Sequence, residues 1–363
     1  MSNMEKVLVN IDSNINVSSY EILIGNGILE DNLSEILDYN KILIVSDDNI
    51  PKDYIEKIYT LSGNKAFMYI IKNGEESKNI KNYEAILDFM LINNFTRNSL
   101  VIALGGGVVG DLSAFVASTY MRGVDFINIP TTFLSMVDSS SGGKTAINYK
   151  NVKNVFGTFY NPKKVIIDIN LLKSLNIREF NSGVIESVKM AMTFDKDYFV
   201  ELFKYIKDVL NNDHNIENHN YVNIYNDLLV DIIKNSVELK KDVIEKDAKE
   251  KNLRRVLNFG HTLGHAIEEA CVDKTLHGEC VARGIYLITD GKIRDEFSEI
   301  MKNLHIDIKC DFDINKAKAN LHHDKKGISD EKVAIIKVNE IGKFEIVDED
   351  IKILEEKLEL IKL

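Results

Sequence analysis

Three histidines in the second half of the chain are the residues best suited to carry chemistry. His261 and His265 are four residues apart in a segment with helical apolar spacing, and His277 follows after about one helix length and a turn. Because helical residues four apart share one face, the first two imidazoles are expected side by side. Neutral imidazoles with a carboxylate bind divalent metals such as zinc. We favour a metal site; a helix face whose histidines are solvated, or hydrogen-bonded in a core, is the alternative.

A glycine-rich turn in the first half is the second candidate. Gly105, Gly107 and Gly110 have the spacing of the dinucleotide-binding fingerprint, between an apolar run and a helical pattern. Glycines let backbone amides approach a ligand, and a helix start offers unpaired N–H groups to a pyrophosphate. The turn comes later in the chain than usual, so a purely structural turn is an equally good interpretation. If a nucleotide binds, Asp47 and Asn49, which follow an earlier apolar run, are better candidates for its ribose.

A long polar loop after residue 130 combines hydroxyls, glycines and cations. Thr131 and Thr132 are followed by Asp138-Ser-Ser-Ser-Gly-Gly-Lys144-Thr145, and then by Lys150, Lys153 and Asn154. Serine, glycine and lysine together can form an anion-binding nest with a point charge. The stretch is not a Walker A loop, because the leading glycine is missing. A solvated surface loop is the alternative, although its length favours a functional role.

Two further groups of polar residues lie on expected helices of the second half. Glu186 and Lys189 are three residues apart, which on spacing alone favours a surface ion pair. Arg254, Asn258, His261 and His265 recur every three or four residues and predict one polar helix face. Such a face beside an apolar one is typical of the wall of a polar pocket.

The elements that must position these residues differ between the two halves of the chain. The first half alternates apolar runs (41–46, 66–71, 99–104, 126–129 and 165–169) with helical patterns such as 79–92, which predicts an α/β fold with a mostly parallel, Rossmann-like sheet. Residues 7–24 predict an antiparallel edge hairpin. The second half reads as mainly α-helical, with helices over 184–192, 198–210, 221–247 and 255–270 and a late hairpin over 333–347. We therefore expect an α/β domain over residues 1–175 and a helical domain over 176–363.

Composition limits the classes of partner. The 363 residues carry a net charge of −11, which argues against a nucleic-acid partner and requires any anion site to be a local cluster of Lys and Arg. Three cysteines without a CxxC pair are expected to be reduced thiols. The sequence shows neither a signal region nor a run of membrane-spanning length, so we expect a soluble, cytoplasmic protein with no membrane partner.

Taken together, these motifs resemble those of the 3-dehydroquinate synthases, a family of sugar-phosphate cyclases, over nearly the whole chain. They occur in the order found in that family. The motifs are Gly74-Glu75-x-x-Lys78, Gly105 to Asp111, Tyr120-x-Arg122-Gly123, Pro130-Thr131-Thr132, Asp138 to Thr145, Lys153-Asn154, Arg178-Glu179, Gly183-x-x-Glu186-x-x-Lys189, Leu257 to Thr262 and His277-Gly278-Glu279.

The resemblance implies that Glu186, His261 and His277 bind the metal ion, which would be Zn²⁺ or Co²⁺. This set differs from the three histidines that spacing suggests, and His265 would instead face the substrate. The resemblance also implies a homodimer and a site in the cleft between an NAD-binding domain and a metal domain. The implied NAD-binding residues are Asp47, Asn49, Asn73, Gly74, Glu75, Lys78, Gly106, Gly107, Val108, Val109, Gly110, Asp111, Thr131, Thr132, Lys144, Lys153, Leu171, Leu172, Lys173 and Ser174. The implied catalytic and substrate-binding residues are Arg122, Asp138, Lys144, Asn154, Lys189, Lys240, Arg254, Asn258, His265 and Lys325.

The implied reaction converts a sugar-phosphate acid, 3-deoxy-D-arabino-heptulosonate 7-phosphate, into 3-dehydroquinate and phosphate in the shikimate pathway. Transient oxidation of the C5 alcohol by NAD acidifies the neighbouring C–H, so that phosphate is eliminated; reduction, ring opening and an intramolecular aldol step follow. Two alternatives stay open. One is another sugar-phosphate cyclase such as 2-deoxy-scyllo-inosose synthase, and the other is an NAD- and metal-dependent polyol dehydrogenase.

Overall fold

The computed structural model describes residues 4–11, 19–150, 152–210, 226–247, 253–323 and 332–363. The chain divides into two compact units, Met1–Asn176 with Ile224–Ala248, and Ile177–Asn223 with Lys249–Leu363. The sequence predicted a single boundary after residue 175. The difference is α8 (Asn226–Lys246), which packs on strands and the polar loop of unit 1 and so belongs to that unit.

Unit 1 is built on one sheet with the strand order β1-β2-β9-β6-β5-β3-β4. The strands are β1 (Met4–Asn10), β2 (Ser19–Gly25), β3 (Lys41–Asp47), β4 (Ala66–Ile71), β5 (Ser99–Gly105), β6 (Asp125–Pro130) and β9 (Lys164–Asp168). Only the edge strand β1 pairs antiparallel, with β2. This confirms both the mostly parallel sheet and the antiparallel edge hairpin. The continuous apolar runs follow from burial on both faces, since β5 is buried at every residue.

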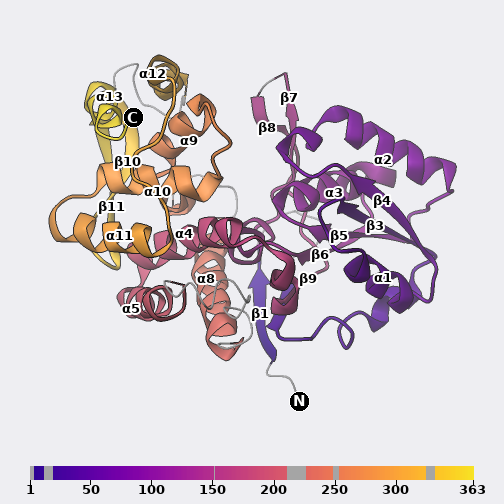
Figure 1. Cartoon of the computed structure of the whole chain (residues 1–363). Coiled ribbons are helices and arrows are strands. Elements are labelled where there is room, and N and C mark those ends of the chain that lie inside the picture. Colours follow the sequence, from indigo (N-terminus) through magenta and orange to yellow (C-terminus); the bar gives the residue numbers. More distant parts are fainter. Residues whose placement is uncertain (1–3, 12–18, 151, 211–225, 248–252, 324–331) are drawn as a thin grey trace. The chain divides into compact units, whose positions relative to one another are not determined.

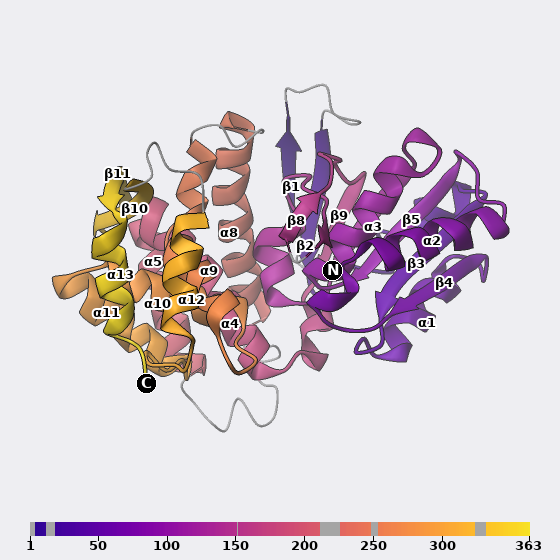
Figure 2. The same ribbon diagram turned by 90° about the horizontal axis from the view of Figure 1, so that it is seen from above.

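Helices cover both faces of this sheet because right-handed crossovers reverse direction at β3. Helix α1 (Lys52–Leu61) connects β3 to the edge strand β4, whereas α2 (Ile80–Ile92) leads from β4 back across β3 to β5, and α3 (Gly107–Thr119) leads from β5 on to β6. Figures 1 and 2 show α2 and α3 together on one face and α1 on the other. Neighbouring strands β3 and β5 therefore mark the point where the strand order reverses. At such a point the carboxyl ends of the strands form the ligand crevice of doubly wound sheets.

Unit 2 is mainly helical and carries one small hairpin. Its principal helices are α4 (Ile177–Phe194), α5 (Lys196–Tyr205), α9 (His261–Ala270), α10 (His277–Ile288), α11 (Gly291–Asn303), α12 (Ile314–His323) and α13 (Ile351–Glu359). Helix α10 packs against both α4 and α9, and α12 packs on α9 (Figure 2). The expected hairpin is confirmed as β10 (Lys332–Glu340) and β11 (Lys343–Asp350).

One expected helix is interrupted. Instead of a single helix over 255–270, a 3₁₀ helix, η7 (Leu253–Asn258), ends before Gly260, and α9 begins at His261. Gly260 has φ +78°, and a Cβ there would lie 2.5 Å from the side chain of Ile285 on α10. The close approach of α10 thus requires glycine at this turn, and the turn breaks the helix.

Candidate functional site

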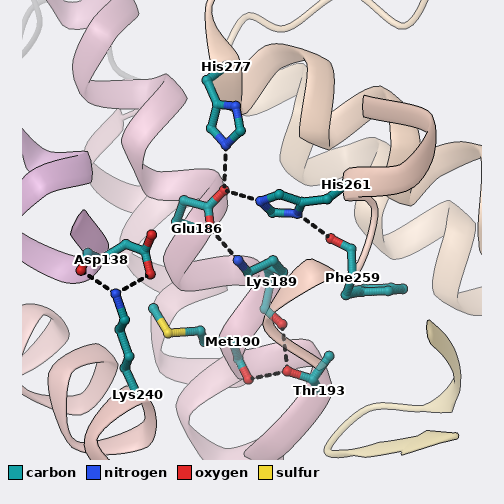
Figure 3. Close-up of polar contacts among 9 residues, drawn as sticks. All are labelled: Asp138, Glu186, Lys189, Met190, Thr193, Lys240, Phe259, His261 and His277. Carbon is teal, nitrogen blue, oxygen red and sulfur yellow. Dashed lines mark hydrogen bonds and ion pairs between the residues drawn. The ribbon is translucent and has the colours of Figure 1, made fainter. Parts of the chain in front are cut away.

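A buried carboxylate facing two imidazoles is the most chemically distinctive feature of unit 2. Glu186, from the middle of α4, is 1% exposed. Its Oε1 lies 3.8 Å from His261 Nε2, at the start of α9, and 3.7 Å from His277 Nε2, at the start of α10. Figure 3 shows both rings pointing at this single oxygen. Because α10 packs on both α4 and α9, three segments far apart in the sequence deliver these groups to one point.

Hydrogen bonds at the far side of each ring fix which nitrogen faces Glu186. His261 Nδ1 lies 3.1 Å from the carbonyl oxygen of Phe259, and His277 Nδ1 lies 2.9 Å from Glu268 Oε2. Carbonyl and carboxylate oxygens only accept, so both Nδ1 atoms donate and both Nε2 atoms present lone pairs in the neutral rings. This is the arrangement of metal-binding histidines oriented by outer partners.

The two histidines differ in basicity. Burial, together with the positive charge of Lys189 and the neighbouring imidazoles, lowers the pKa of His261 well below its usual value, so this ring is neutral. Burial also acts to lower the pKa of His277, but its hydrogen bond to Glu268 and the charge of Glu186 outweigh that effect and raise it. Glu268 therefore makes His277 the more basic of the two rings.

The cluster fits a divalent metal ion. Glu186 Oε1 is buried and has no hydrogen-bond partner among the described residues, which is costly for a carboxylate oxygen unless a cation completes it. Ligands about 2.1 Å from one tetrahedral zinc ion lie roughly 3.4 Å apart. The observed separations of 3.7 and 3.8 Å are close to that value.

The position of His265 leaves two ligand sets geometrically open. The ligand atoms of His261, His265 and His277 also lie within 4.8 Å of one another, the set suggested by histidine spacing. We favour Glu186 over His265 as the third ligand, because Glu186 is buried and its oxygen lacks a partner, whereas the side chain of His265 is exposed. His265 thus lies beside the cluster, with its ring centroid 5.2 Å from that of His261 and 5.7 Å from that of His277.

Lys189 forms an ion pair with the other oxygen of the same carboxylate, Oε2 of Glu186 (Figure 3). The spacing predicted this pair, but its expected surface position is wrong: Lys189 is 2% exposed and Glu186 is 1% exposed. The reason is that α4 is covered by α10, so this face of α4 lies inside the unit.

A pocket adjoins the histidines within unit 2. Asn258, His261 and His265 line it, so the structure brings these three predicted residues together. Arg254 is instead buried, at 3% exposure, and the neighbouring Arg255 lines the pocket, because the 3₁₀ geometry of η7 and the break at Gly260 rotate the residues away from one helical face. The opposite wall was not predicted: it consists of Val333, Ala334, Ile335, Ile336 and Ile346 of the hairpin.

In unit 1, the carboxyl end of β3 holds the residues expected at a ribose. Asp47 is 5% exposed, and its Oδ1 accepts hydrogen bonds from Asn49 N (2.9 Å) and Asn73 Nδ2 (3.5 Å). Burial raises the pKa of Asp47. Gly74 adopts φ +116° in the following turn. The expected residues Asp47, Asn49 and Asn73 are therefore in contact, next to the strand that carries the glycine turn.

The glycine turn leads from β5 into α3, and side chains packed against it leave no room for a Cβ. Helix α3 starts at Gly107, so Gly107 to Asp111 form its first turns. A Cβ on Gly105 would lie 2.6 Å from the side chain of Val109, and one on Gly107 would lie 3.0 Å from Ser139 Oγ. Val108 and Val109 thus lie in the first turn of the helix, with Val109 buried. The structural and nucleotide-binding interpretations of the turn are compatible, since the same glycines bring strand and helix close together.

Thr132 and Ser139 carry hydroxyl groups close to the N-terminus of α3. Thr131 N donates to the carbonyl oxygen of Gly105 at 3.0 Å, and a Cβ on Gly106 would lie 3.1 Å from Thr132 Cγ2. Thr131 Oγ1, Ser139 Oγ and Ser140 Oγ are buried and have no hydrogen-bond partner among the described residues. Ser139 was not among the predicted site residues; it stands in the serine run 139–141, where the sequence does not distinguish its three members.

Lys78 joins three of the predicted residues in one network. Its Nζ, on a side chain that is 5% exposed, lies 2.5 Å from Asp111 Oδ2 and 2.5 Å from Asn154 Oδ1. Asn148 ties the network to the preceding turn: its Nδ2 donates to Glu75 Oε1 (2.7 Å) and its Oδ1 accepts from Asn154 N (2.8 Å). The role of Asn148 was missed, because an isolated asparagine carries no sequence signal.

Asp138 and Lys240, which are 102 residues apart in the sequence, form the second network of unit 1. Lys240 Nζ lies 2.8 Å from Asp138 Oδ1 and also bonds to the backbone oxygen of Asp138 (Figure 3). Lys240 is 4% exposed, so α8 delivers a buried cation to the polar loop.

The remaining predicted residues of unit 1 occupy exposed positions or a short helix. Lys144, Lys153 and Arg122 are exposed, and Arg122 adopts φ +71°. Leu171, Leu172, Lys173 and Ser174 lie in the 3₁₀ helix Ile169–Ser174, where the two leucines are buried. Lys325, predicted to bind substrate, lies outside the described residues.

These features define a class. A parallel sheet with a glycine turn beside its switch point, and a helical unit with a carboxylate–imidazole cluster, are typical of enzymes that use a dinucleotide and a divalent metal. In the part of the chain that the structure describes, no helix is long and apolar enough to cross a membrane.

Comparison with known proteins gives the family. The 3-dehydroquinate synthase N-terminal model matches residues 68–182, and the C-terminal model matches residues 183–327. A 3-dehydroquinate synthase of Prochlorococcus marinus (strain MIT 9312) is 38% identical over 96% of this chain and 97% of its own length. One from Alkaliphilus metalliredigens is 42% identical over 78% of this chain and 76% of its own length. The chain belongs to the 3-dehydroquinate synthase family.

Solved structures show the same fold. A 2-deoxy-scyllo-inosose synthase complexed with carbaglucose-6-phosphate, NAD⁺ and Co²⁺ has a TM-score of 0.84 and 22% identity, with coverage of 97% of this chain and 98% of that chain. A 2-epi-5-epi-valiolone synthase from Streptomyces hygroscopicus with NAD⁺ and Zn²⁺ has a TM-score of 0.82 and 23% identity, with coverage of 96% and 98%. At this level of identity the likeness concerns the fold.

Proposed function

We propose that this chain converts 3-deoxy-D-arabino-heptulosonate 7-phosphate into 3-dehydroquinate and phosphate, as a carbon–oxygen lyase of the shikimate pathway. The observation that carries the proposal is Oε1 of Glu186, which has no hydrogen-bond partner among the described residues and faces the lone pairs of His261 and His277 in a chain of this family. Relatives solved with NAD⁺ and with Co²⁺ or Zn²⁺ support the same pair of cofactors here. The homodimer and the cytoplasmic location implied by the resemblance remain predictions.

When bound, NAD⁺ would supply reversible hydride transfer at C5 of the substrate, and a divalent metal would supply Lewis-acid polarisation of the C5 hydroxyl. The residues of unit 2 prepare the metal site. Glu186, His261 and His277 would hold the ion, and Glu268 and the carbonyl of Phe259 keep the two rings oriented with Nε2 forward. Lys189 holds the second oxygen of Glu186 and thereby fixes the carboxylate.

The residues of unit 1 are suited to the dinucleotide. The carboxylate of Asp47 is positioned to accept hydrogen bonds from ribose hydroxyls, because its Oδ1 is already held by Asn49 and Asn73. The N-terminus of α3, with the hydroxyls of Thr131 and Ser139 nearby, suits a pyrophosphate.

An anionic substrate requires local cations in a chain of net charge −11. Lys189 and Lys240 are almost fully buried and each is held by a carboxylate, so their ammonium groups are fixed in position. Lys144 and Arg122 are exposed cations that can approach the substrate, and Arg254 adds a buried one. We assign Lys325 the same role by resemblance alone.

The test is a phosphate-release assay with the seven-carbon substrate, with and without chelator and NAD⁺. We expect phosphate release that needs both cofactors while total NADH stays near zero, since the hydride is returned in each cycle. His261→Ala should abolish both zinc binding and phosphate release, and His322→Ala, on the exposed side of α12, should alter neither.

Three results would contradict the proposal. Stoichiometric NADH formation would identify a dehydrogenase. Turnover of glucose 6-phosphate instead of the seven-carbon acid would identify an inosose-type cyclase, since such an enzyme binds its carba analogue. Full activity of His261→Ala without metal would exclude the proposed metal role.

A further inference from the structure

All three cysteines of the chain converge at one place in unit 2, outside the cluster described above. Cys271 follows the last residue of α9, Cys280 lies in α10, and Cys310 lies in the segment between α11 and α12. Cys271 pairs with Phe312 in an antiparallel bridge, and the backbone bond from Asp313 N to Ala270 O (2.9 Å) holds the two segments together. Cys310 is two residues from Phe312, so its side chain emerges on the same side of this short ladder.

The thiol of Cys271 stands between the other two. The side chains of Cys280, Cys310 and Thr275 all lie close enough to influence its ionisation. All three cysteines are free thiols. Cys280 is completely buried, whereas Cys271 and Cys310 are partly exposed, so a small reagent from solution can reach the latter two.

A buried arginine gives this cluster its electrostatic character. Arg283 lies one turn after Cys280 on α10 and is 5% exposed. Its Nε and Nη1 have no hydrogen-bond partner among the described residues. A buried guanidinium needs a negative counterpart, and its charge favours the ionised form of Cys271.

The three thiols are unequal as a result. Hydrogen bonds from Cys280, Cys310 and Thr275 outweigh burial, and with the charge of Arg283 they lower the pKa of Cys271. The hydrogen bond to Cys271 and burial raise the pKa of Cys280 and of Cys310, and nearby Glu268 and Asp311 add to the respective increases. The central thiol is the acidic one, and its two neighbours keep their protons.

We propose that Cys271 is a reactive thiolate, a site of covalent modification by small electrophiles and peroxides, and that Cys310 is its resolving partner. With hydrogen peroxide, the Cys271 thiolate attacks one oxygen, the O–O bond breaks, and the products are a sulfenic acid at Cys271 and a hydroxide ion, which takes up a proton from solvent to give water. The Cys310 thiol then attacks that sulfur, releases a second water and forms the Cys271–Cys310 disulfide. Two thiols are oxidised by two electrons in total, and one peroxide is reduced to two waters.

Metal binding by the three cysteines is not supported. Among the described residues, the only group of histidines, cysteines and carboxylates with metal-like spacing is the histidine cluster. A central thiol with a neighbour on either side suits thiol–disulfide chemistry, and the accessible neighbour is Cys310.

The first test measures which cysteine reacts. The metal-loaded, fully reduced protein is treated with limiting iodoacetamide at pH 6, and peptide mass spectrometry reports the site. We expect Cys271 to be alkylated at least tenfold faster than Cys280 and Cys310, and this preference to disappear in urea. Equal rates for Cys271 and Cys310 in the folded protein would overturn the assignment of a reactive thiolate.

The second test follows one equivalent of hydrogen peroxide. We expect free thiols to fall from three to one and a Cys271–Cys310 cross-linked peptide to appear. Cys310→Ser should leave a sulfenic acid at Cys271 that dimedone traps, and Cys280→Ala, the matched control, should still give the same disulfide. A Cys271–Cys280 disulfide would overturn Cys310 as the resolving thiol. Unchanged thiol content in the native protein would overturn the proposal without any variant.

Discussion

Replacing Glu268 tests whether an outer carboxylate sets the strength of the metal site. Glu268 Oε2 accepts a hydrogen bond from His277 Nδ1 at 2.9 Å. Outer partners of metal-binding histidines contribute roughly 10- to 100-fold to metal affinity, equivalent to about 1.4–2.7 kcal/mol. Glu268→Gln keeps an acceptor and loses the charge, so we expect a loss near tenfold. Glu268→Ala also frees the ring, so we expect a loss nearer 100-fold.

The assay is competition for zinc between the metal-free protein and a chromophoric chelator, which measures affinity without turnover. Glu269→Gln is the matched control, because Glu269 is the next residue on the same helix and is exposed. It should bind zinc within about twofold of the unmodified chain. Wild-type affinity in both Glu268 variants, or an equal loss in Glu269→Gln, would refute the idea that Glu268 orients His277.

Three further predictions concern the buried charges. Lys189→Met should cost the metal-free protein about 3 kcal/mol of unfolding free energy, because Glu186 is left buried without its partner; urea unfolding should show that added zinc recovers most of this loss. Burial raises the pKa of Asp47, which means that the folded state favours the protonated carboxyl. The contribution of Asp47 to the free energy of unfolding is therefore complete below its unfolded pKa of about 3.9 and is lost as pH rises through its folded pKa. Asp47→Asn should resist urea better than the unmodified chain at pH 7 and equally at pH 3, while binding NAD⁺ more weakly in a titration. Lys240→Met should lower kcat/KM for the phosphorylated substrate by about 10- to 100-fold through loss of a charged hydrogen bond, with little change for Lys241→Met in the same steady-state assay.

The main elements of the fold were predictable because their patterns are local. Continuous apolar runs identified β3 and β5 as buried strands, and alternation identified the β1–β2 hairpin. The assignment of α8 to unit 1 was not predictable, since it depends on which surface a long amphipathic helix finds. The helix break at Gly260 was not predictable for a similar reason. The glycine is visible in the sequence, but the break depends on the close approach of Ile285, which only the structure shows.

The candidate site was predictable to the extent that its residues stand in recognisable motifs. The two histidines and the glycine turn are visible by spacing, whereas Glu186 entered the metal set only through the family resemblance. Spacing alone placed Glu186 and Lys189 on the surface, because it does not report what covers a helix face. Glu268 and Asn148 act through residues far away in the sequence, His277 and Glu75, and no local pattern marks them.

The division of labour between the two oxygens of Glu186 explains how an acidic chain can attract an acidic substrate. Oε2 forms an ion pair with Lys189, which is 2% exposed. Oε1 is left for a dication, and the two imidazoles add ligand atoms but no charge, since the Nε2 atoms face inward as neutral acceptors. With a metal bound, the two carboxylates of Glu186 and Glu268 would thus stand against the three positive charges of Lys189 and the dication, in a setting where charges are weakly screened. That local excess of about one positive charge favours a ligand with a carboxylate and a phosphate, even though the whole chain carries a net charge of −11.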